Sequence, residues 1–219
     1  MNFRATLILG LSSLALLGGC ATSRSVLDIP PPEARAAAQA TGGEVFIVSV
    51  TDRRAFETAP RSPDIPSLDP GRGQDGAIKA RAVGRKRNSF GRALGDILLK
   101  EGQSVETLTA SSIRQAFAEK GYKVIDRRED TTPNTLFVDA SVDKFWSWMT
   151  PGFSALTLST EISTDLAIQS PAQGNAPGKT VTASIRAYGN YQTGMEGNWI
   201  EVINKALRAY IDELKAKLE

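Results

Sequence analysis

Three stretches in the second half of the chain alternate between apolar and polar residues. They are residues 136–142, 156–168 and 180–191. The apolar residues fall mainly on even positions in the first two stretches and on odd positions in the third. Successive side chains of a β-strand point to opposite faces of a sheet, so each stretch predicts a strand with one buried and one solvated face. This pattern is typical of antiparallel sheets.

Two other segments show the spacing of an amphipathic helix. Ser104 is a suitable N-cap for the first helix, whose apolar residues recur up to Phe117 before Gly121 ends it. The second begins near Asn198, which has capping-box spacing to Glu201, and carries a wide apolar stripe. We therefore expect one helix in the middle of the chain and one near its C-terminus.

Two short apolar runs, residues 44–51 and 122–125, add two further strands. Residues 52–102 are rich in proline, glycine and charge, which predicts a long basic loop. The predicted fold is a single α+β domain over residues 44–219, with two layers and the order βαββββα. Its sheet is expected to be mostly antiparallel, with two helices packed on one face.

The N-terminus has the pattern of a secretory signal. Arg4 precedes an apolar segment that ends in Leu17-Gly18-Gly19-Cys20. This segment of about fifteen residues is shorter than the roughly twenty that a membrane-spanning helix needs. It resembles a bacterial lipoprotein signal, which implies removal of residues 1–19 and acylation of Cys20. By the same resemblance, Ala21 implies retention at the outer membrane, with the protein facing the periplasm.

Residues 20–43 contain three consecutive prolines, many small residues and few large apolar ones. This composition predicts a lipidated flexible tether that lifts the folded body off the membrane.

The composition excludes several kinds of chemistry. The chain has no histidine, and Cys20 is its only cysteine. A Ser-His-Asp triad, a cysteine nucleophile and the common zinc-ligand sets are therefore absent from the predicted mature chain. The formal net charge is +2 and falls to +1 when Arg4 leaves with the signal, which gives no general reason to expect a nucleic-acid partner. We expect no cofactor and no metal.

Part of the chain resembles a known family. The run Leu108-Thr109-Ala110-Ser111 lies in the first predicted helix, and Glu119-Lys120-Gly121-Tyr122-Lys123-Val124 ends it. Followed by three strands and a terminal helix, these runs resemble the YajG-type lipoproteins. The resemblance covers the signal and residues 104–219, whereas residues 52–102 are longer and more basic than in that family. It implies a lipid-anchored α+β protein but no activity, since the molecular function of the family is unsettled.

A basic segment is the first candidate binding site. Between residues 72 and 92 the chain has seven cations and one acid. The candidate binding residues are Arg81, Arg85, Lys86, Arg87 and Arg92. Such a cluster can bind lipid head-group phosphates or an anionic polymer. The alternative is a solvated loop whose charges keep the protein soluble.

An aromatic segment is the second candidate. Trp146, Trp148 and Phe153 lie where the chain bends between two predicted strands. Large aromatic side chains at a hairpin tip favour a partner or a membrane interface. Alternatively, the two tryptophans share the even positions of the buried face and complete the core.

Four acids are the third candidate. If the hairpin between the first two alternating stretches turns about its glycine, Asp139 faces Asp165 and Asp143 faces Glu161. Such a cluster would need Arg186, a cation, or a raised pKa that suits acid catalysis. In the alternative interpretation, the acids are separate and solvated on an open sheet face.

From these observations we expect a protein that is not an enzyme. It is expected to be a binding or scaffolding module of the cell envelope, anchored to the membrane by its N-terminal lipid. Its partner would be an envelope protein or an anionic polymer. The alternative is a carboxylate-dependent hydrolase of peptidoglycan or another glycan.

Overall fold

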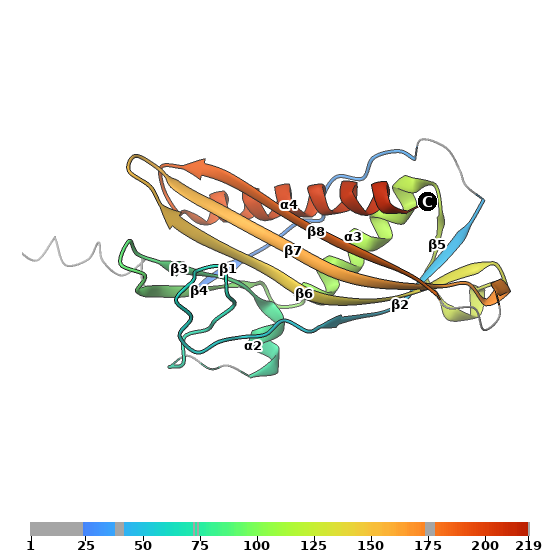
Figure 1. Ribbon diagram of the computed structural model, residues 1–219, viewed down its shortest axis with the longest axis horizontal. Helices are drawn as coiled ribbons and strands as arrows, with labels where there is room; N and C mark the ends of the chain where they lie inside the picture. Colours follow the sequence, from blue (N-terminus) through green and yellow to red (C-terminus); the bar gives the residue numbers. More distant parts are fainter. Residues whose placement is uncertain (1–23, 38–41, 72, 74, 174–177, 219) are drawn as a thin grey trace, which may run out of the picture.

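Eight strands in the described part of the chain form one sheet, and three α-helices accompany it (Figure 1). The structure is a computed structural model that describes residues 24–37, 42–71, 73, 75–173 and 178–218. The elements are β1 (Ser25–Leu27), β2 (Glu44–Asp52), α2 (Gly76–Arg81), β3 (Ala82–Arg87), β4 (Ala93–Leu99), α3 (Val105–Lys120), β5 (Lys123–Ile125), η1 (Arg128–Asp130), β6 (Thr135–Pro151), β7 (Leu156–Gln169), η2 (Pro171–Gln173), β8 (Lys179–Tyr191) and α4 (Glu196–Lys217).

Strand β6 is the centre of the sheet. One edge of β6 pairs with β7, which in turn pairs with β8, and both pairings are antiparallel. The other edge is shared, because β2 pairs with the first half of β6 and β3 pairs with the second half, both in parallel. Four of the seven strand pairings are parallel, which corrects the expected mostly antiparallel sheet. The alternation of apolar and polar residues indicates which face of a strand is buried, but not which strand lies beside it or in which direction that strand runs. The parallel pairings could therefore not be predicted from the sequence.

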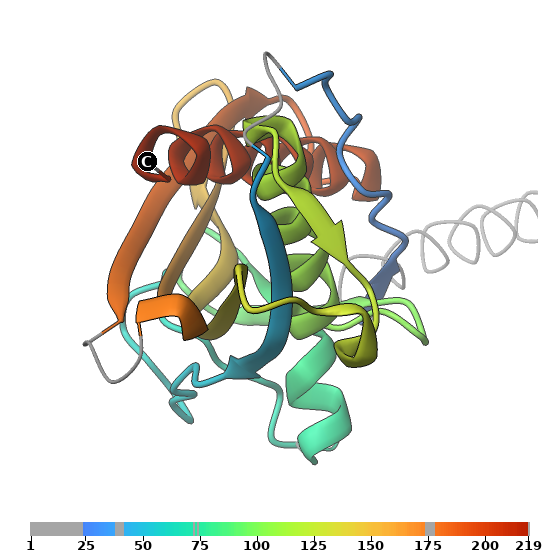
Figure 2. The same ribbon diagram turned by 90° about the vertical axis from the view of Figure 1, so that its right-hand side faces the viewer.

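The predicted α+β class is confirmed, and both predicted helices are present. Ser104 caps α3 by accepting a hydrogen bond from the Thr107 amide at 3.1 Å, and Gly121 ends the helix with φ of 103°. Helix α4 instead begins at Glu196, and Asn198 donates to the Thr193 carbonyl, so the expected capping box at Asn198 is wrong. Helix α4 packs along β7 and β8, whereas α3 packs against β2 and α4 (Figure 2). Both helices contribute to the main core, but only α4 lies along the sheet strands β7 and β8, so the expected pair of helices on one sheet face is found only in part.

A β-bulge changes which side of β6 faces the main core. The pairing register shifts between Val142 and Lys144, so Asp143 is an extra residue. Before the bulge Val142 faces the core beneath the helices, and after it Phe145 does. Because the parity changes, Trp146 faces the opposite side of the sheet.

A second, smaller core lies on that opposite side. It contains Leu68, Ala82, Leu98, Trp146 and Trp148, with Phe56 and Ile78 packed against it. The chain between β2 and β3 therefore covers the outer face of β6 and its neighbours. The bulge makes this second core possible, because it turns two tryptophans towards the covering chain.

The expected long loop over residues 52–102 is corrected, since it contains α2, β3 and β4. Arg54 holds it to the sheet. Its buried guanidinium forms an ion pair with Asp52 at 2.7 Å and donates to the carbonyls of Ala82 at 2.5 Å and Phe145 at 3.0 Å. At Gly84 a Cβ atom would lie 2.7 Å from the Ser147 carbonyl oxygen, so glycine allows β3 to approach β6. The charge of Arg54 and the missing side chain of Gly84 thus help this segment to pack against the sheet.

The expected tether is corrected over its described residues, 24–37. Strand β1 pairs in parallel with β4, and Leu27 and Ile29 are buried in the main core. The predicted signal, residues 1–19, and the predicted acylation site, Cys20, lie outside the described residues. None of the helices in the described part of the chain has both the length and the apolar character of a membrane span.

Candidate functional site

Four of the five predicted basic residues have structural contacts, and three of these lie before the end of β3. Arg85 is buried, donates to the Leu68 carbonyl at 3.1 Å and lies 3.6 Å from Asp96. Lys86 donates to the Ser25 hydroxyl at 3.1 Å. Arg81 donates to the Leu99 carbonyl at 2.8 Å. The expectation that these cations form one exposed patch is therefore wrong, because each of the three is hydrogen-bonded to a neighbouring segment of the fold.

The other two lie near the turn that joins β3 to β4. Arg87 is half-buried and donates to the Gly91 carbonyl and the Ser67 hydroxyl at 3.1 and 3.2 Å. Burial and the nearby positive charge of Arg85 lower the pKa of Arg87. Arg92 is exposed. Arg92 is therefore the exposed cation of the basic segment, at the turn between β3 and β4. The other four cations contact neighbouring parts of the fold.

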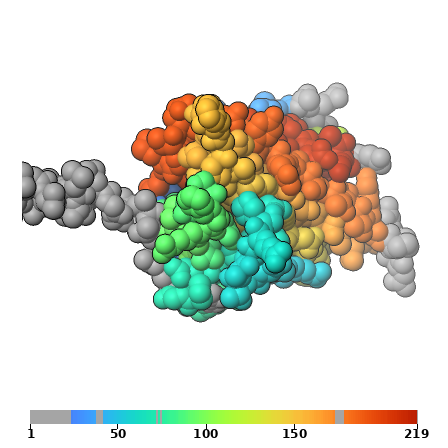
Figure 3. Space-filling model, turned by 60° about the vertical axis from the view of Figure 1, so that its left-hand side comes forward, coloured from blue at the N-terminus to red at the C-terminus, as the bar shows by residue number. Residues whose placement is uncertain are grey.

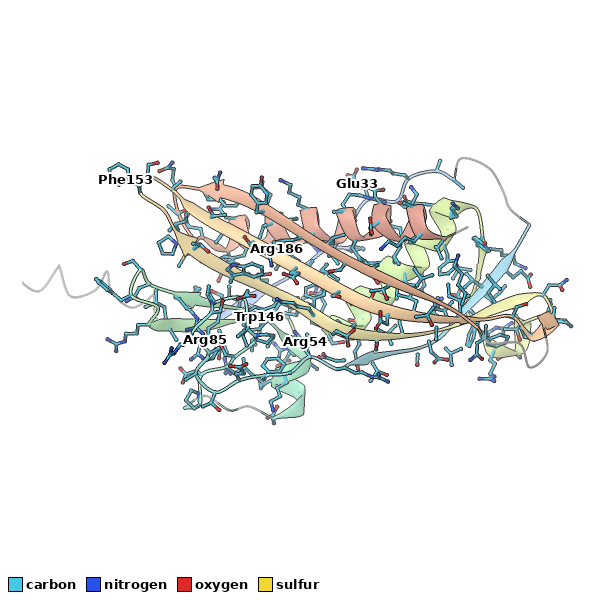
Figure 4. All side chains as sticks on the ribbon, in the orientation of Figure 1. Glu33, Arg54, Arg85, Trp146, Phe153 and Arg186 are labelled. Atoms are coloured by element: carbon cyan, nitrogen blue, oxygen red, sulfur yellow. The ribbon has the colours of Figure 1, made fainter. Side chains whose placement is uncertain are left out.

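The three predicted aromatic residues also divide into buried and exposed ones. Trp146 is fully buried, and its indole N–H donates to the Pro63 carbonyl at 3.2 Å. The Trp148 ring is covered by Arg186, whose guanidinium carbon lies 5.0 Å from the ring centroid. Phe153 is fully exposed at the tip of the β6–β7 hairpin (Figure 4). The two tryptophans are therefore core residues, which confirms one of the two interpretations of the sequence. They lie in the second core, however, and not in the core beneath α4.

Exposed apolar side chains gather at one end of the molecule, here called the hairpin end. We define it as the β3–β4 turn (88–92), the β6–β7 turn (152–155) and the loop 192–195 before α4. β3 runs parallel to β6 with Arg85 opposite Trp148, so their turns lie at the same end of the sheet (Figures 1 and 3). Tyr191 is paired with Leu156, which brings the loop before α4 to this end as well.

The hairpin end carries the three most exposed large apolar side chains of the described residues. Phe153, Phe90 and Met195 have relative exposures of 110%, 93% and 67%. Each lies in a different one of the three connections.

The four predicted acids do not form a cluster. The observed register places Asp165 opposite Ser141 and Glu161 opposite Trp146, while Asp143 lies in the bulge. Glu161 forms ion pairs with Arg186 at 2.6 Å and with Lys144 at 3.4 Å. Asp165 accepts a hydrogen bond from Thr182. Within the described ranges, no three residues of the types His, Cys, Asp and Glu are grouped to hold a metal ion.

The outer face of β7 and β8 is a long exposed surface, here called the outer strip. Its residues are Ser163, Asp165, Thr182, Ser184, Arg186 and Tyr188. The β8 members are all exposed, and Tyr188 has 59% relative exposure. The open edge of β8 is less accessible, because Lys205 and Lys217 of α4 donate to its carbonyls at Tyr188 and Thr182, each at 2.8 Å. Lysines at an edge oppose the addition of a further strand, so the face of the strip is the better binding surface.

A buried acid holds the beginning of the described chain. Asp96 in β4 is fully buried and forms an ion pair with Arg24 at 2.9 Å. Its other oxygen accepts a hydrogen bond from the Asp69 amide at 3.0 Å and lies 3.6 Å from Arg85. A buried carboxylate is tolerated when charged and polar partners surround it in this way.

A second buried acid holds the end of the same N-terminal segment. Glu119 in α3 accepts hydrogen bonds from Arg208 at 2.7 and 2.8 Å, Lys215 at 2.8 Å and the Arg35 amide at 3.0 Å. Burial opposes ionisation of Glu119, but the hydrogen bonds from Arg208, Lys215 and Gln115 outweigh it and hold its pKa far below 4.5. Asp96 and Glu119 thus fasten residues 24 and 35 to the body.

Sequence analysis missed both acids, although a signal existed for Asp96. It lies within the apolar run 93–99, which has the length of a buried strand. Glu119 sits in a predicted helix at a position that gives no sign of burial. Its partners Arg35, Arg208 and Lys215 are 84 to 96 residues away in the chain. Only the fold brings them together.

Comparisons with known proteins identify similar structures but no family. No protein-family model matches the chain, and no curated protein matches it. Among solved structures, an uncharacterized protein is similar with a TM-score of 0.49 and 9% identity, covering 90% of this chain and 99% of that one. A Xanthomonas campestris protein assigned to DUF330 has a TM-score of 0.48 and 11% identity, covering 90% and 93%. Lipoprotein GNA1162 from Neisseria meningitidis has a TM-score of 0.33 and 9% identity, covering 78% and 98%.

None of these likenesses reaches a TM-score of 0.5. The function is therefore argued from the residues of this chain alone, and the resemblance to YajG-type lipoproteins stays an interpretation of the sequence.

Proposed function

We propose that this protein is a non-enzymatic binding module of a bacterial cell envelope. It is anchored to the outer membrane through acylated Cys20, faces the periplasm and binds an envelope protein through the outer strip. The anchor rests on the N-terminal pattern that ends at Cys20. The binding role rests on one observation: the outer face of β8 presents a row of exposed side chains at Thr182, Ser184, Arg186 and Tyr188.

The charges of the outer strip favour a protein partner over an anionic polymer. Arg186 has 56% side-chain exposure but is already paired with Glu161, and Asp165 adds a negative charge nearby. The strip therefore has no excess of positive charge to attract a polyanion. It instead combines a cation, an acid, hydroxyls and the Tyr188 ring, a mixture suited to a polar protein interface.

The hydrolase alternative has less support. A glycosidase of the usual kind needs two carboxyl groups placed on either side of the bond to be cleaved. On the outer face Glu161 is held by two cations, Asp165 is hydrogen-bonded to Thr182, and Asp139 is hydrogen-bonded to Ser49. The acids of this face thus serve as partners within the sheet.

Photo-crosslinking in intact cells tests the proposal. A photoreactive residue at Tyr188 should yield a discrete crosslinked product, whereas one at Glu129, at the other end of β6, should not. Ser184→Arg should reduce the product at Tyr188 while changing the stability of the protein by less than about 1 kcal/mol, because Ser184 is an exposed residue of the same strip. The proposal is wrong if both positions give the same products, or if the purified protein cleaves peptidoglycan and Glu161→Gln abolishes the cleavage.

A further inference from the structure

We propose that the hairpin end docks on the phospholipid surface in which the Cys20 acyl chains are anchored. The folded body would then lie directly on the membrane rather than above it. This inference rests on the proposed lipid anchor and adds to it the orientation of the body and the side chains that enter the lipid interface.

The direction of β1 places the anchor at the hairpin end. β1 runs parallel to β4, and Ser25 is paired with Ile97. Strand β4 runs away from its turn, which precedes Ala93. The chain that precedes Ser25 therefore leaves β1 on the side of the hairpin end.

The length of the connection matches the distance to that end. Four residues separate Ile97 from Ala93, which is about 13 Å along a strand at roughly 3.3 Å per residue. Cys20 is five residues from Ser25, which is paired with Ile97, so it lies at most about 18 Å from Ser25. Because Asp96 fixes Arg24 to the body, an acylated Cys20 can be little further out than the turns themselves. Any membrane that holds Cys20 must then meet the hairpin end.

The side chains at this end suit a lipid interface. Phe90 and Phe153 project fully from two turns, and Met195 projects from the third connection. Apolar side chains such as these bind at the boundary between head groups and acyl chains. Arg92 is exposed two residues after Phe90 in the same turn, where it can attract anionic head groups. Glu196, which follows Met195, is the nearest acid in the sequence to these side chains.

Both hairpin turns are held in place before any contact with lipid. The Asn88 side chain accepts hydrogen bonds from the amides of Phe90 at 3.0 Å and Arg92 at 2.9 Å. Gly91 supplies the left-handed conformation of this turn, with φ of 78°. In the other turn the Gly152 amide donates to the Ala155 carbonyl at 2.8 Å. A rigid turn loses little conformational freedom when its aromatic side chain inserts.

Single fluorescent labels on the lipidated full chain test the inference. Acylation uses the only native thiol, so a cysteine introduced by Phe90→Cys or Phe153→Cys is the single labelling site. The protein is reconstituted in vesicles of phosphatidylethanolamine and phosphatidylglycerol and labelled with an environment-sensitive fluorophore. Glu129→Cys, at the other end of the sheet, is the matched control.

We expect a blue shift and a several-fold rise in emission at positions 90 and 153, with quenching by spin-labelled lipids, and neither effect at position 129. If the protein floats with the vesicles but all three labels report water, the docking inference is overturned and the anchor stands. If the protein does not float at all, the anchor fails, and docking fails with it. Emission that changes at 90 and 153 only after an envelope protein is added would assign the hairpin end to a protein partner and overturn docking on lipid.

Discussion

Replacing Asp96 by alanine should lower the free energy of unfolding by about 3–5 kcal/mol, because it leaves the buried Arg85 without its charged partner. The Asp69 amide would also lose its acceptor. Asp126→Ala is the matched control: this acid is 82% exposed in its pair with Arg114, and its loss should change stability by less than about 1 kcal/mol. Urea unfolding of the two variants measures the difference.

The same variant reports on the N-terminal segment. Without Asp96, Arg24 loses its ion pair, and the chain beside it should separate from β4 more often. Trypsin should then cleave after Arg24 faster in Asp96→Ala than in Asp126→Ala. Equal losses of stability and equal cleavage rates in the two variants would contradict the role assigned to Asp96.

The second large effect is expected at Glu119. Glu119→Gln removes the negative charge that Arg208 and Lys215 share and should lower the free energy of unfolding by about 2–3 kcal/mol. Glu213→Gln on α4 is the matched control, because its pair with Lys217 joins two partly exposed residues one helical turn apart. Its loss should cost only about 0.2–0.5 kcal/mol.

The effect of Glu119 should depend on pH in a fixed direction. Its pKa is lower in the folded protein than its ordinary value of 4.5. The unfolded chain therefore takes up the proton first, and the stability that Glu119 contributes is present above 4.5 and is lost as the pH falls towards the folded-state pKa. The stability difference between the native protein and Glu119→Gln should shrink between neutral pH and about pH 3. A difference that is the same at both values would contradict this account.

Local patterns predicted the regular elements well. Strands β6, β7 and β8 follow the alternation of the sequence, and the first cap and the glycine end of α3 are where the sequence places them. Side-chain period and capping chemistry act over a few residues, so they can be read without the fold. The prediction for β6 failed only after Asp143, where one extra residue reversed the faces and moved Trp146 to the second core.

The candidate site was harder to predict, because its charged residues pair with residues that are far away in the sequence. Arg85 was predicted as a binding residue because its partner Asp96 lies eleven residues away on the neighbouring strand. Arg24 reaches the same acid from a segment with the composition of a tether. β1 is three residues long, which is too short for alternation to reveal it. Phe153 was predicted as an exposed tip residue, but only the parallel pairing of β3 with β6 brings Phe90 to the same end.

The intact mass of the protein extracted from outer membranes tests the central claim, the anchor, most directly. The account predicts a mature chain that begins at Cys20 and carries the additional mass of acyl chains. It also predicts that Cys20→Ser accumulates as an unprocessed precursor without them. A membrane-extracted protein with a free thiol at Cys20, or a Cys20→Ser protein of mature length that still fractionates with outer membranes, would contradict it.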